Sequence, residues 1–465
     1  MRPHPTLLAV LLALGACEPP ESGAPPPDPA AANQRPGHAA TLTVGETPRQ
    51  RFEGFGFSFE QGSPYPELSA ERRAEVDRLL YDELGTRIIR LWYAPGRPYE
   101  IRDHFLATGI IPHALEHGVT ELLLGPGHYI GDPEEHARTM AEDIATMRDD
   151  WGIRITASGV VNEPDAQDWK IVPASHYLPL MIAMRRELDA RGLEAVTTIG
   201  PEFASADDKA LGWLDAIAAD PEALAATDAL GTHSYNMAAT PEFAERVLRN
   251  GLQHWMTEAG GPEPDDASAE HDHGFAASVS ARFLNDINQS VSHWVWFLAL
   301  GEGRRDPYQK LVMCEGRCAN TSRIYKNASY HHAQLVSAAF RPGSVMRHVT
   351  SDLPRWQEMV WSYGPKPPLQ AAAALRPDGR YALAVVNDTT GISAARTSWD
   401  QPTDYRVTFA VPELAGQDGI TFDLCRTNAE VQAQCGETAM LEDGRVSLDL
   451  DSLELITLVT REPVS

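Results

Sequence analysis

The chain has 465 residues, which is enough for two domains, or for one large domain and a smaller one. Hydrophobic residues make up 43% of it, as in an ordinary globular protein. It carries 65 acidic and 39 basic residues, so its formal net charge is −26. A surface with this charge repels phosphate-rich polymers and anionic lipid headgroups, which argues against nucleic acid as a partner and favours a neutral one.

The first 17 residues predict export. The stretch MRPHPTLLAVLLALGAC has a charged start, an apolar core too short to cross a bilayer as a helix, and small residues before Cys17. LGAC resembles a lipobox, the cleavage site of bacterial lipoproteins, and on that resemblance Cys17 becomes the lipidated N-terminus that anchors the protein to the cell envelope, at the outer membrane or cell surface. A plain secretory signal is the alternative. Residues 18–40 are rich in Pro, Ala and Gly and have no apolar period, so they predict a disordered tether.

Residues 41–341 predict a (β/α)8 barrel, because apolar strand-like runs alternate with amphipathic helical stretches and right-handed crossovers close eight such units into a ring. The eight runs are EGFGFSF (53–59), TRIIRLWY (86–93), VTELLLG (119–125), IRITASGVV (153–161), VTTIGPEF (196–203), ALGTHSYN (229–236), QHWMTEAG (253–260) and SHWVWFLAL (292–300). A doubly wound open sheet is the alternative, but it usually needs fewer units and a Gly-rich phosphate turn, GxGxxG, which the sequence lacks.

Residues 342–465 predict a smaller antiparallel β-sandwich domain. After FRPGS, residues 340–344, short strand candidates follow one another with turn residues between them and no strong helical pattern. The segment 41–50, ahead of the barrel, is a candidate extra strand of this domain.

Four cysteines other than Cys17 form two close pairs, Cys314 with Cys318 and Cys425 with Cys435. In an exported chain such pairs predict disulfides. A zinc site is the alternative, but each pair lacks the second pair of ligands that zinc would need.

The ends of the predicted barrel strands carry polar side chains suited to catalysis. Strands of such barrels present active-site residues at their C-terminal ends. Here two strands end in a carboxylate, Glu163 in VNEP and Glu258 in TEAG, while Arg90, His233 and Tyr235 stand at the ends of others. Glycosidic bond cleavage requires such a pair of carboxylates, one protonated to release the leaving sugar and one ionised to attack the anomeric carbon.

These motifs resemble those of clan A retaining glycosidases, and most closely glycoside hydrolase family 30. The resemblance covers residues 50–350 and rests on GFGFSFE, IIRLWY, VNEP, THSY, TEAG and WFLAL in barrel order, followed by YHHAQLVSAAFRPGS. It implies hydrolysis by double displacement, with Glu163 as the general acid/base and Glu258 as the nucleophile. The pKa of Glu163 is then expected to lie high, so that it can donate a proton near neutral pH.

The resemblance also implies residues that bind the substrate. Asn162 matches the residue that hydrogen-bonds the sugar 2-hydroxyl. Arg90 and Tyr235 match residues that orient and ionise the nucleophile. His233 matches a pocket-lining residue, and Trp296 matches a wall of the −1 subsite.

Two places depart from the family pattern. Gly56-Phe57 stands where the family often has Gly-Gly, and LLLGPGHYI replaces the usual Trp after the third strand. Tyr129, within that replacement, and Trp92 are candidate substrate-binding aromatics. Both departures fall where subsites are built, so the identity of the sugar stays open.

The sequence therefore predicts a retaining β-glycosidase that acts on a polysaccharide or glycoconjugate and touches the membrane only through an N-terminal lipid. No cofactor and no metal are expected, and the expected partner is a carbohydrate. The alternative is a carbohydrate-binding surface lipoprotein that keeps the barrel but has lost catalysis, although such a protein has no need to keep both carboxylates.

Overall fold

The computed structural model describes residues 38–165, 172, 174–233, 238–260, 270–303, 307–354, 368–391, 401–417 and 419–464. The predicted signal segment, the predicted lipidation site Cys17 and residues 18–37 of the predicted tether lie outside these residues. For residues 38–40 the tether prediction is wrong, because they begin a β-strand. Within the described ranges no helix combines the length and the apolar character needed to cross a bilayer.

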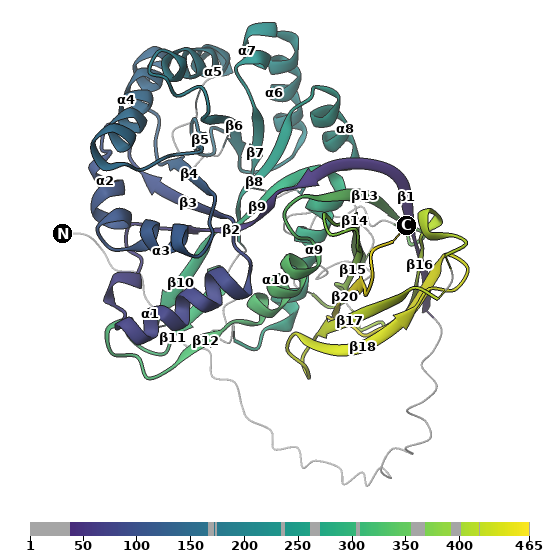
Figure 1. Cartoon of the computed structure of the whole chain (residues 1–465). Helices are drawn as coiled ribbons and strands as arrows, with labels where there is room; N and C mark the ends of the chain where they lie inside the picture. Colours follow the sequence, from purple (N-terminus) through teal and green to yellow (C-terminus); the bar gives the residue numbers. More distant parts are fainter. Residues whose placement is uncertain are drawn as a thin grey trace, which may run out of the picture. The chain divides into compact units, whose positions relative to one another are not determined.

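The predicted barrel is confirmed. Eight strands, each paired in parallel with both neighbours, close into a ring. They are β2 (Gly54–Phe59), β3 (Ile88–Tyr93), β4 (Glu121–Pro126), β5 (Ala157–Gly159), β6 (Thr197–Phe203), β7 (Ala229–Thr232), β8 (Gln253–Ala259) and β9 (Val291–Trp296). Figure 1 shows α4 to α8 outside the strands that they connect.

Ten α-helices lie in the described part of the chain, and several of them begin at a side chain that caps the first turn. They are α1 (Ala70–Asp77), α2 (Tyr99–Ile101), α3 (Ile110–Glu116), α4 (Pro133–Trp151), α5 (Ala174–Asp189), α6 (Asp208–Ala219), α7 (Pro221–Ala225), α8 (Pro241–Arg249), α9 (His273–Gln289) and α10 (Ala328–Ala339). The Ser69 side chain accepts from the Arg72 N–H at the start of α1. The longest, α4, starts at an Asp132 cap and ends at Gly152, whose φ of 67° suits glycine.

The inside of the barrel changes character along the strands. Nearer the N-terminal strand ends the inward residues form an apolar layer: Ile88, Leu123, Ala157, Ile199, Ala229, Trp255 and Val295. Alternate residues of a strand share a face, so residues two positions further along four of these strands face inward again. These are Arg90, Gly125, Gly159 and Gly231. The apolar layer is thus followed, toward the C-terminal strand ends, by a layer that contains one arginine and three glycines.

The predicted C-terminal β domain is also confirmed, and its strands are joined in one sheet. The sheet order is β18-β17-β20-β15-β14-β13-β1-β16-β19, antiparallel except where β1 pairs with β16. The strands are β1 (His38–Phe52), β13 (Ser344–Ser351), β14 (Leu369–Leu375), β15 (Tyr381–Asn387), β16 (Tyr405–Ala410), β17 (Thr421–Thr427), β18 (Gln434–Met440), β19 (Arg445–Leu450) and β20 (Leu455–Thr460). The candidate strand 41–50 lies within β1.

Helices α9 and α10 pack against this sheet and join it to the barrel (Figure 1). On α9 the Ser278 hydroxyl donates to Asp388 Oδ1 over 2.7 Å. The Asn288 side chain accepts from the Val349 N–H and donates to its carbonyl, over 2.7 and 2.9 Å. Because these bonds are buried, they fix the sheet on the barrel.

Both predicted disulfides are confirmed. Cys314 is bonded to Cys318 beside a small sheet of β10 (Leu298–Glu302), β11 (Lys310–Cys314) and β12 (Ile324–Lys326). Cys425 is bonded to Cys435 and ties β17 to β18.

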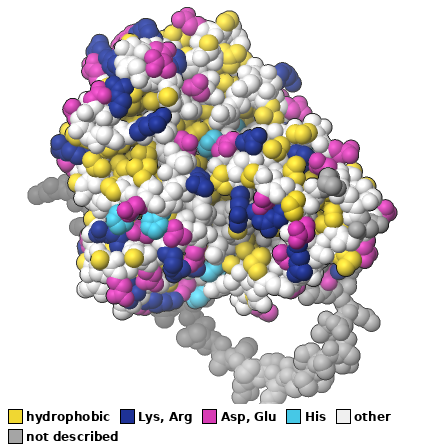
Figure 2. All heavy atoms as spheres, viewed as in Figure 1, with side chains coloured by type: hydrophobic (Ala, Val, Ile, Leu, Met, Phe, Trp, Pro, Cys, Tyr) yellow, Lys and Arg dark blue, Asp and Glu magenta, His cyan; other side chains and the backbone are white. Residues whose placement is uncertain are grey.

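Figure 2 shows acidic and basic side chains interspersed over the face in view, so the excess negative charge does not gather in one patch there.

Candidate active site

Five of the predicted residues meet at the C-terminal ends of the barrel strands. Arg90 is on β3, Asn162 and Glu163 follow β5, His233 follows β7 directly, and Glu258 is near the end of β8. All five are buried, with at most 8% of the residue exposed. Charged groups this deeply buried need partners, and these partners define the site.

The chain leaves β5 in a conformation that turns Glu163 into the site. Glu163 has a φ of 44°, in the left-handed region that costs a non-glycine residue roughly 1–2 kcal/mol. Its N–H donates to the Glu202 carbonyl over 2.9 Å, and Asn162 forms an isolated parallel bridge to Glu202. Pro164 then prevents further pairing of the strand. The neighbouring strand thus holds Glu163 in its unusual conformation.

Arg90 connects the two ends of the site. One guanidinium nitrogen donates to Glu258 Oε2 over 2.6 Å, and the other donates to Asn162 Oδ1 over 2.9 Å and Glu202 Oε1 over 3.1 Å. The guanidinium lies 4.3 Å from the centre of the Trp92 ring. Trp92 therefore packs against Arg90 in a cation–π contact. The buried ion pair with Arg90 fixes the position of the Glu258 carboxylate.

His233 lies between the two carboxylates. Its Nδ1 is 2.7 Å from Glu163 Oε1 and 3.9 Å from Glu258 Oε2, and its Nε2 is 3.9 Å from Glu202 Oε1. Burial alone would lower the pKa of His233, but Glu258, Glu163 and Glu202 outweigh burial and raise it to about 10. His233 is therefore a cation at neutral pH.

The pKa of Glu163 is lowered, whereas the sequence predicts that it is raised. Burial opposes its ionisation, but the hydrogen bond and charge of His233, with the charge of Arg90, hold the pKa of Glu163 below its usual value. In the free protein the proton shared by Glu163 and His233 thus resides mainly on the histidine. We attribute the difference to His233, whose contact with Glu163 cannot be read from the spacing of the two residues in the sequence.

The predicted aromatic residues take different places. Trp296, at the end of β9, is 1% exposed and its indole N–H donates to the Gln309 carbonyl over 2.8 Å. Tyr129 follows β4, and its hydroxyl lies 3.3 Å from His176 Nδ1 on α5. Tyr235 lies outside the described residues. The ring of Trp296 is thus held by the backbone at Gln309, whereas Tyr129 packs toward α5.

Sequence reasoning missed Glu202. This residue on β6 is completely buried and bonds Arg90, so it belongs to the same cluster. One signal pointed to it, since Glu202 lies near the end of a predicted barrel strand. The register of β6 on β7 shifts between Ile199 and Glu202, so simple alternation does not predict which side chain faces inward.

The same cluster is also a group that could be considered for a metal. Glu163, His233 and Glu258 each offer one potential ligand atom, and these atoms lie within 4.8 Å of one another. However, Arg90 already contacts Glu258, and a protonated His233 has no lone pair to give a metal. The residues therefore fit an ion-pair network better than a cation site.

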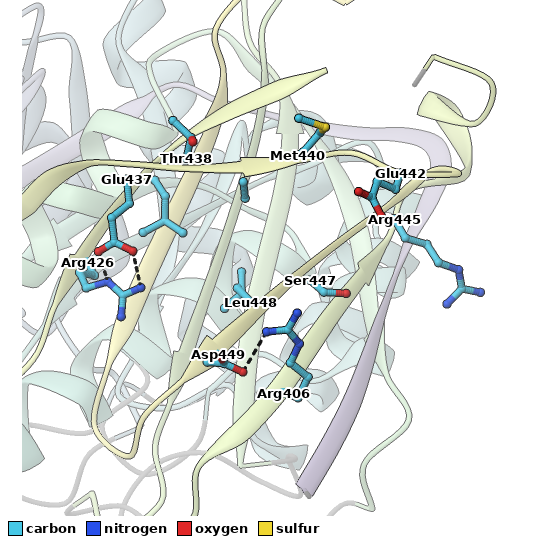
Figure 3. Close-up of a pocket in the computed structure, with 12 residues that line it drawn as sticks. Arg406, Arg426, Glu437, Thr438, Met440, Glu442, Arg445, Ser447, Leu448 and Asp449 are labelled. Carbon is cyan, nitrogen blue, oxygen red and sulfur yellow. Dashed lines mark hydrogen bonds and ion pairs between the residues drawn. The ribbon is translucent and has the colours of Figure 1, made fainter. Parts of the chain in front are cut away.

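A hollow of about 590 Å³ lies on the β domain, on different elements from the carboxylate cluster. Figure 3 shows Arg426 pointing toward Glu437 and Arg406 toward Asp449, and both pairs form ion pairs over 2.9 and 3.0 Å. No aromatic side chain is found among the described residues that line it. It lacks the flat apolar faces that stack on sugar rings.

No family model matches the sequence, and no curated protein matches it. Solved structures do match. A family 30 endoxylanase from Clostridium papyrosolvens has a TM-score of 0.63 at 17% identity, covering 91% of this chain and 100% of that one. A conserved exported protein from Bacteroides fragilis has a TM-score of 0.66 at 12% identity, and the match covers 90% of this chain and 100% of that one. An endo-β-1,6-glucanase has a TM-score of 0.61 at 13% identity, and the match covers 90% of this chain and 94% of that one. The chain therefore has the fold of glycoside hydrolase family 30 enzymes.

Proposed function

We propose that the protein is a retaining β-glycosidase that hydrolyses a polysaccharide or glycoconjugate. The observation that carries the proposal is the approach of Glu163 and Glu258, whose nearest carboxylate oxygens lie within 4.8 Å of each other at the strand ends. Carboxyl groups about 5 Å apart suit a double displacement, whereas inverting enzymes leave room for a water between theirs.

In this mechanism Glu258 attacks the anomeric carbon and the bond to the leaving sugar breaks. Glu163 protonates the leaving oxygen with the proton that it shares with His233, and a covalent glycosyl–Glu258 ester forms. Glu163 then takes a proton from water as that water attacks the anomeric carbon, the bond to Glu258 breaks, and the sugar leaves with its configuration retained. Arg90 orients Glu258 through their ion pair, and the Asn162 side chain is available to bind the sugar 2-hydroxyl.

Other residues complete the proposed site. Tyr235 is proposed to orient Glu258, and Trp296 to form a wall of the −1 subsite. Trp92 and Tyr129 are proposed as further substrate contacts. Two disulfides and the likeness to an exported protein support secretion. We propose lipidation at Cys17 as the anchor to the envelope.

The test is hydrolysis of aryl β-glycosides, xylan and β-1,6-glucan, since the last two are the substrates named for structural neighbours. Replacing the nucleophile in Glu258→Ala is expected to lower kcat/KM by roughly 10³-fold or more. Azide should rescue this variant and yield a glycosyl azide of inverted configuration. Glu163→Ala should lose more activity on substrates with poor leaving groups.

The matched control is Glu437→Ala, which removes a carboxylate that also pairs with an arginine but is 55% exposed on the β domain. Its activity should equal that of the wild type. Sugar binding without turnover by the wild type would contradict the proposal and favour the binding lipoprotein.

A further inference from the structure

Glu202 is a third carboxylate inside the barrel, and the proposed mechanism does not use it. Its side chain has no exposed surface, and it makes ion pairs with two cations. Its Oε1 lies 3.1 Å from Arg90 Nη2 and 3.9 Å from His233 Nε2. A buried carboxylate without partners would be strongly destabilising, so these two cations are what allow it to be ionised.

The same two cations contact the two proposed catalytic carboxylates. Arg90 donates to Glu258 over 2.6 Å, and His233 Nδ1 lies 2.7 Å from Glu163 Oε1. The charges therefore alternate along a chain from Glu258 through Arg90, Glu202 and His233 to Glu163. Glu202 lies at the centre of this chain and contacts both cations, and His233 also lies 3.9 Å from Glu258 Oε2.

The barrel leaves space for this carboxylate. A Cβ added at Gly159 on β5 would lie 1.8 Å from Glu202 Oε2, and one at Gly231 on β7 would lie 2.8 Å from Glu202 Cγ. On the other side of the pair, a Cβ at Gly125 on β4 would lie 2.9 Å from Arg90 Nε. Three strands thus present glycine where a side chain would displace Glu202 or Arg90.

We propose that Glu202 is the positioning residue that holds the proton of His233 and the guanidinium of Arg90 in place for the proposed reaction. The inference rests on the proposed function, since it assigns Glu202 a role at that site. Together with Glu258 and Glu163, the negative charge of Glu202 keeps His233 protonated, and the Glu163–His233 pair therefore retains one proton well above neutral pH.

The other groups that face Glu202 do not replace its charge. The Tyr177 hydroxyl on α5 is buried, which raises its pKa and keeps it neutral, and the Thr257 hydroxyl on β8 is neutral too. Glu163 is a like charge, and Glu202 raises its pKa. Glu258 also faces His233 and raises its pKa, so removing Glu202 should weaken the proton's binding without abolishing it.

The experiment compares the wild type with Glu202→Gln, which keeps the shape and removes the charge. In the variant the basic limb of the kcat/KM profile should move to lower pH by one unit or more. Histidine-selective ¹⁵N NMR, with the His233 signal assigned through His233→Asn, should show the second ring proton lost at correspondingly lower pH. The control is Glu454→Gln, an equally buried carboxylate on the β domain that pairs with Arg426.

An unchanged His233 titration in Glu202→Gln would overturn the inference. If that variant does not fold, the NMR titration of His233 in the wild type still tests the inference. A His233 that titrates near pH 6.5 would show that Glu202 does not hold its proton. The NMR titration requires no substrate. A wild type that hydrolyses nothing would therefore contradict the proposed function, while the role of Glu202 would be judged separately.

Discussion

Arg90 shows how much one side chain can do at this site. Its guanidinium is completely buried and donates to Glu258, Asn162 and Glu202. A planar group with several fixed N–H donors can serve three acceptors at once, whereas an ammonium is a single point charge. The geometry of the site thus depends on the shape of this cation as well as on its charge.

We expect Arg90→Lys to lower kcat/KM by roughly 10²-fold. Each lost hydrogen bond to a charged group is worth about 1.5–3 kcal/mol, and lysine cannot replace them all. Steady-state kinetics, with circular dichroism to verify folding, would measure the effect. The matched change Arg406→Lys affects a pair with Asp449 that is about half exposed, so it should leave activity unaltered. A folded Arg90→Lys protein within twofold of wild type would contradict this account.

The sequence predicted most of the residues of this cluster, for a physical reason. Parallel strands place their C-terminal ends at one rim, so polar residues following apolar runs must meet there. That argument located Glu163 and Glu258. It could not locate Glu202, whose inward direction depends on a register shift, or predict the pKa of Glu163, which depends on a contact with His233.

Most barrel strands were predicted with small errors in length. The predicted strand 292–300 is wrong in part, because it divides into β9 of the barrel and β10 of the small sheet. At β5, the apolar run 153–161 predicts a strand but only Ala157–Gly159 pair as one. The chain then bends through Val160 and Val161 and makes a single bridge at Asn162. Apolar character shows that a segment is buried, but not whether its backbone stays in the sheet.

The inner face of β5 gives a prediction for the element as a whole. In Gly159→Ala the new methyl group would collide with Glu202, so the variant should lose about 1–3 kcal/mol of unfolding free energy and much of its activity. Urea denaturation would measure the loss. Gly212→Ala, within α6 where nothing lies near the added carbon, should instead gain roughly 0.5–1 kcal/mol. Equal stability of the two variants would show that β5 is not packed against Glu202.

At the scale of the whole molecule, the least predictable feature is which strands of the β domain pair with β1. Residues 38–43 of β1 pair in parallel with residues 405–410 of β16, and β1 also pairs with β13. The sequence marks 41–50 as a strand, but local propensity carries no information on which distant strand it joins. Such pairings are chosen by burial of both strands in one core, which only the complete chain provides.

Several histidines buried through the molecule make its stability depend on pH. Burial lowers the pKa of His254 to about 3, where its ring bonds Thr232 and Ser290. The unfolded chain binds this proton below about pH 6.5 and the folded chain does not, so stability present above pH 6.5 is lost as the pH falls toward 3. Burial also lowers the pKa of His136 and His331 to about 4, and that of His293 and His332 to about 3.

We therefore expect the unfolding free energy of the wild type to fall between pH 6 and 4 more steeply than that of His254→Gln, by about 1.4 kcal/mol per pH unit. Urea titrations at a series of pH values would give both slopes. Taking the difference between the proteins cancels the buried carboxyls that oppose the trend, such as Asp286, whose pKa burial raises to about 7. Parallel curves for the two proteins would contradict the assignment.

The central claim is that Glu163 and Glu258 act as a retaining pair, and proton NMR of the first sugar released from an aryl β-glycoside tests it most directly. Two successive displacements at the anomeric carbon return the original configuration. We therefore expect the β-anomer to form first and the α-anomer to appear only later by mutarotation. Initial release of the α-anomer would show a single displacement and contradict the claim.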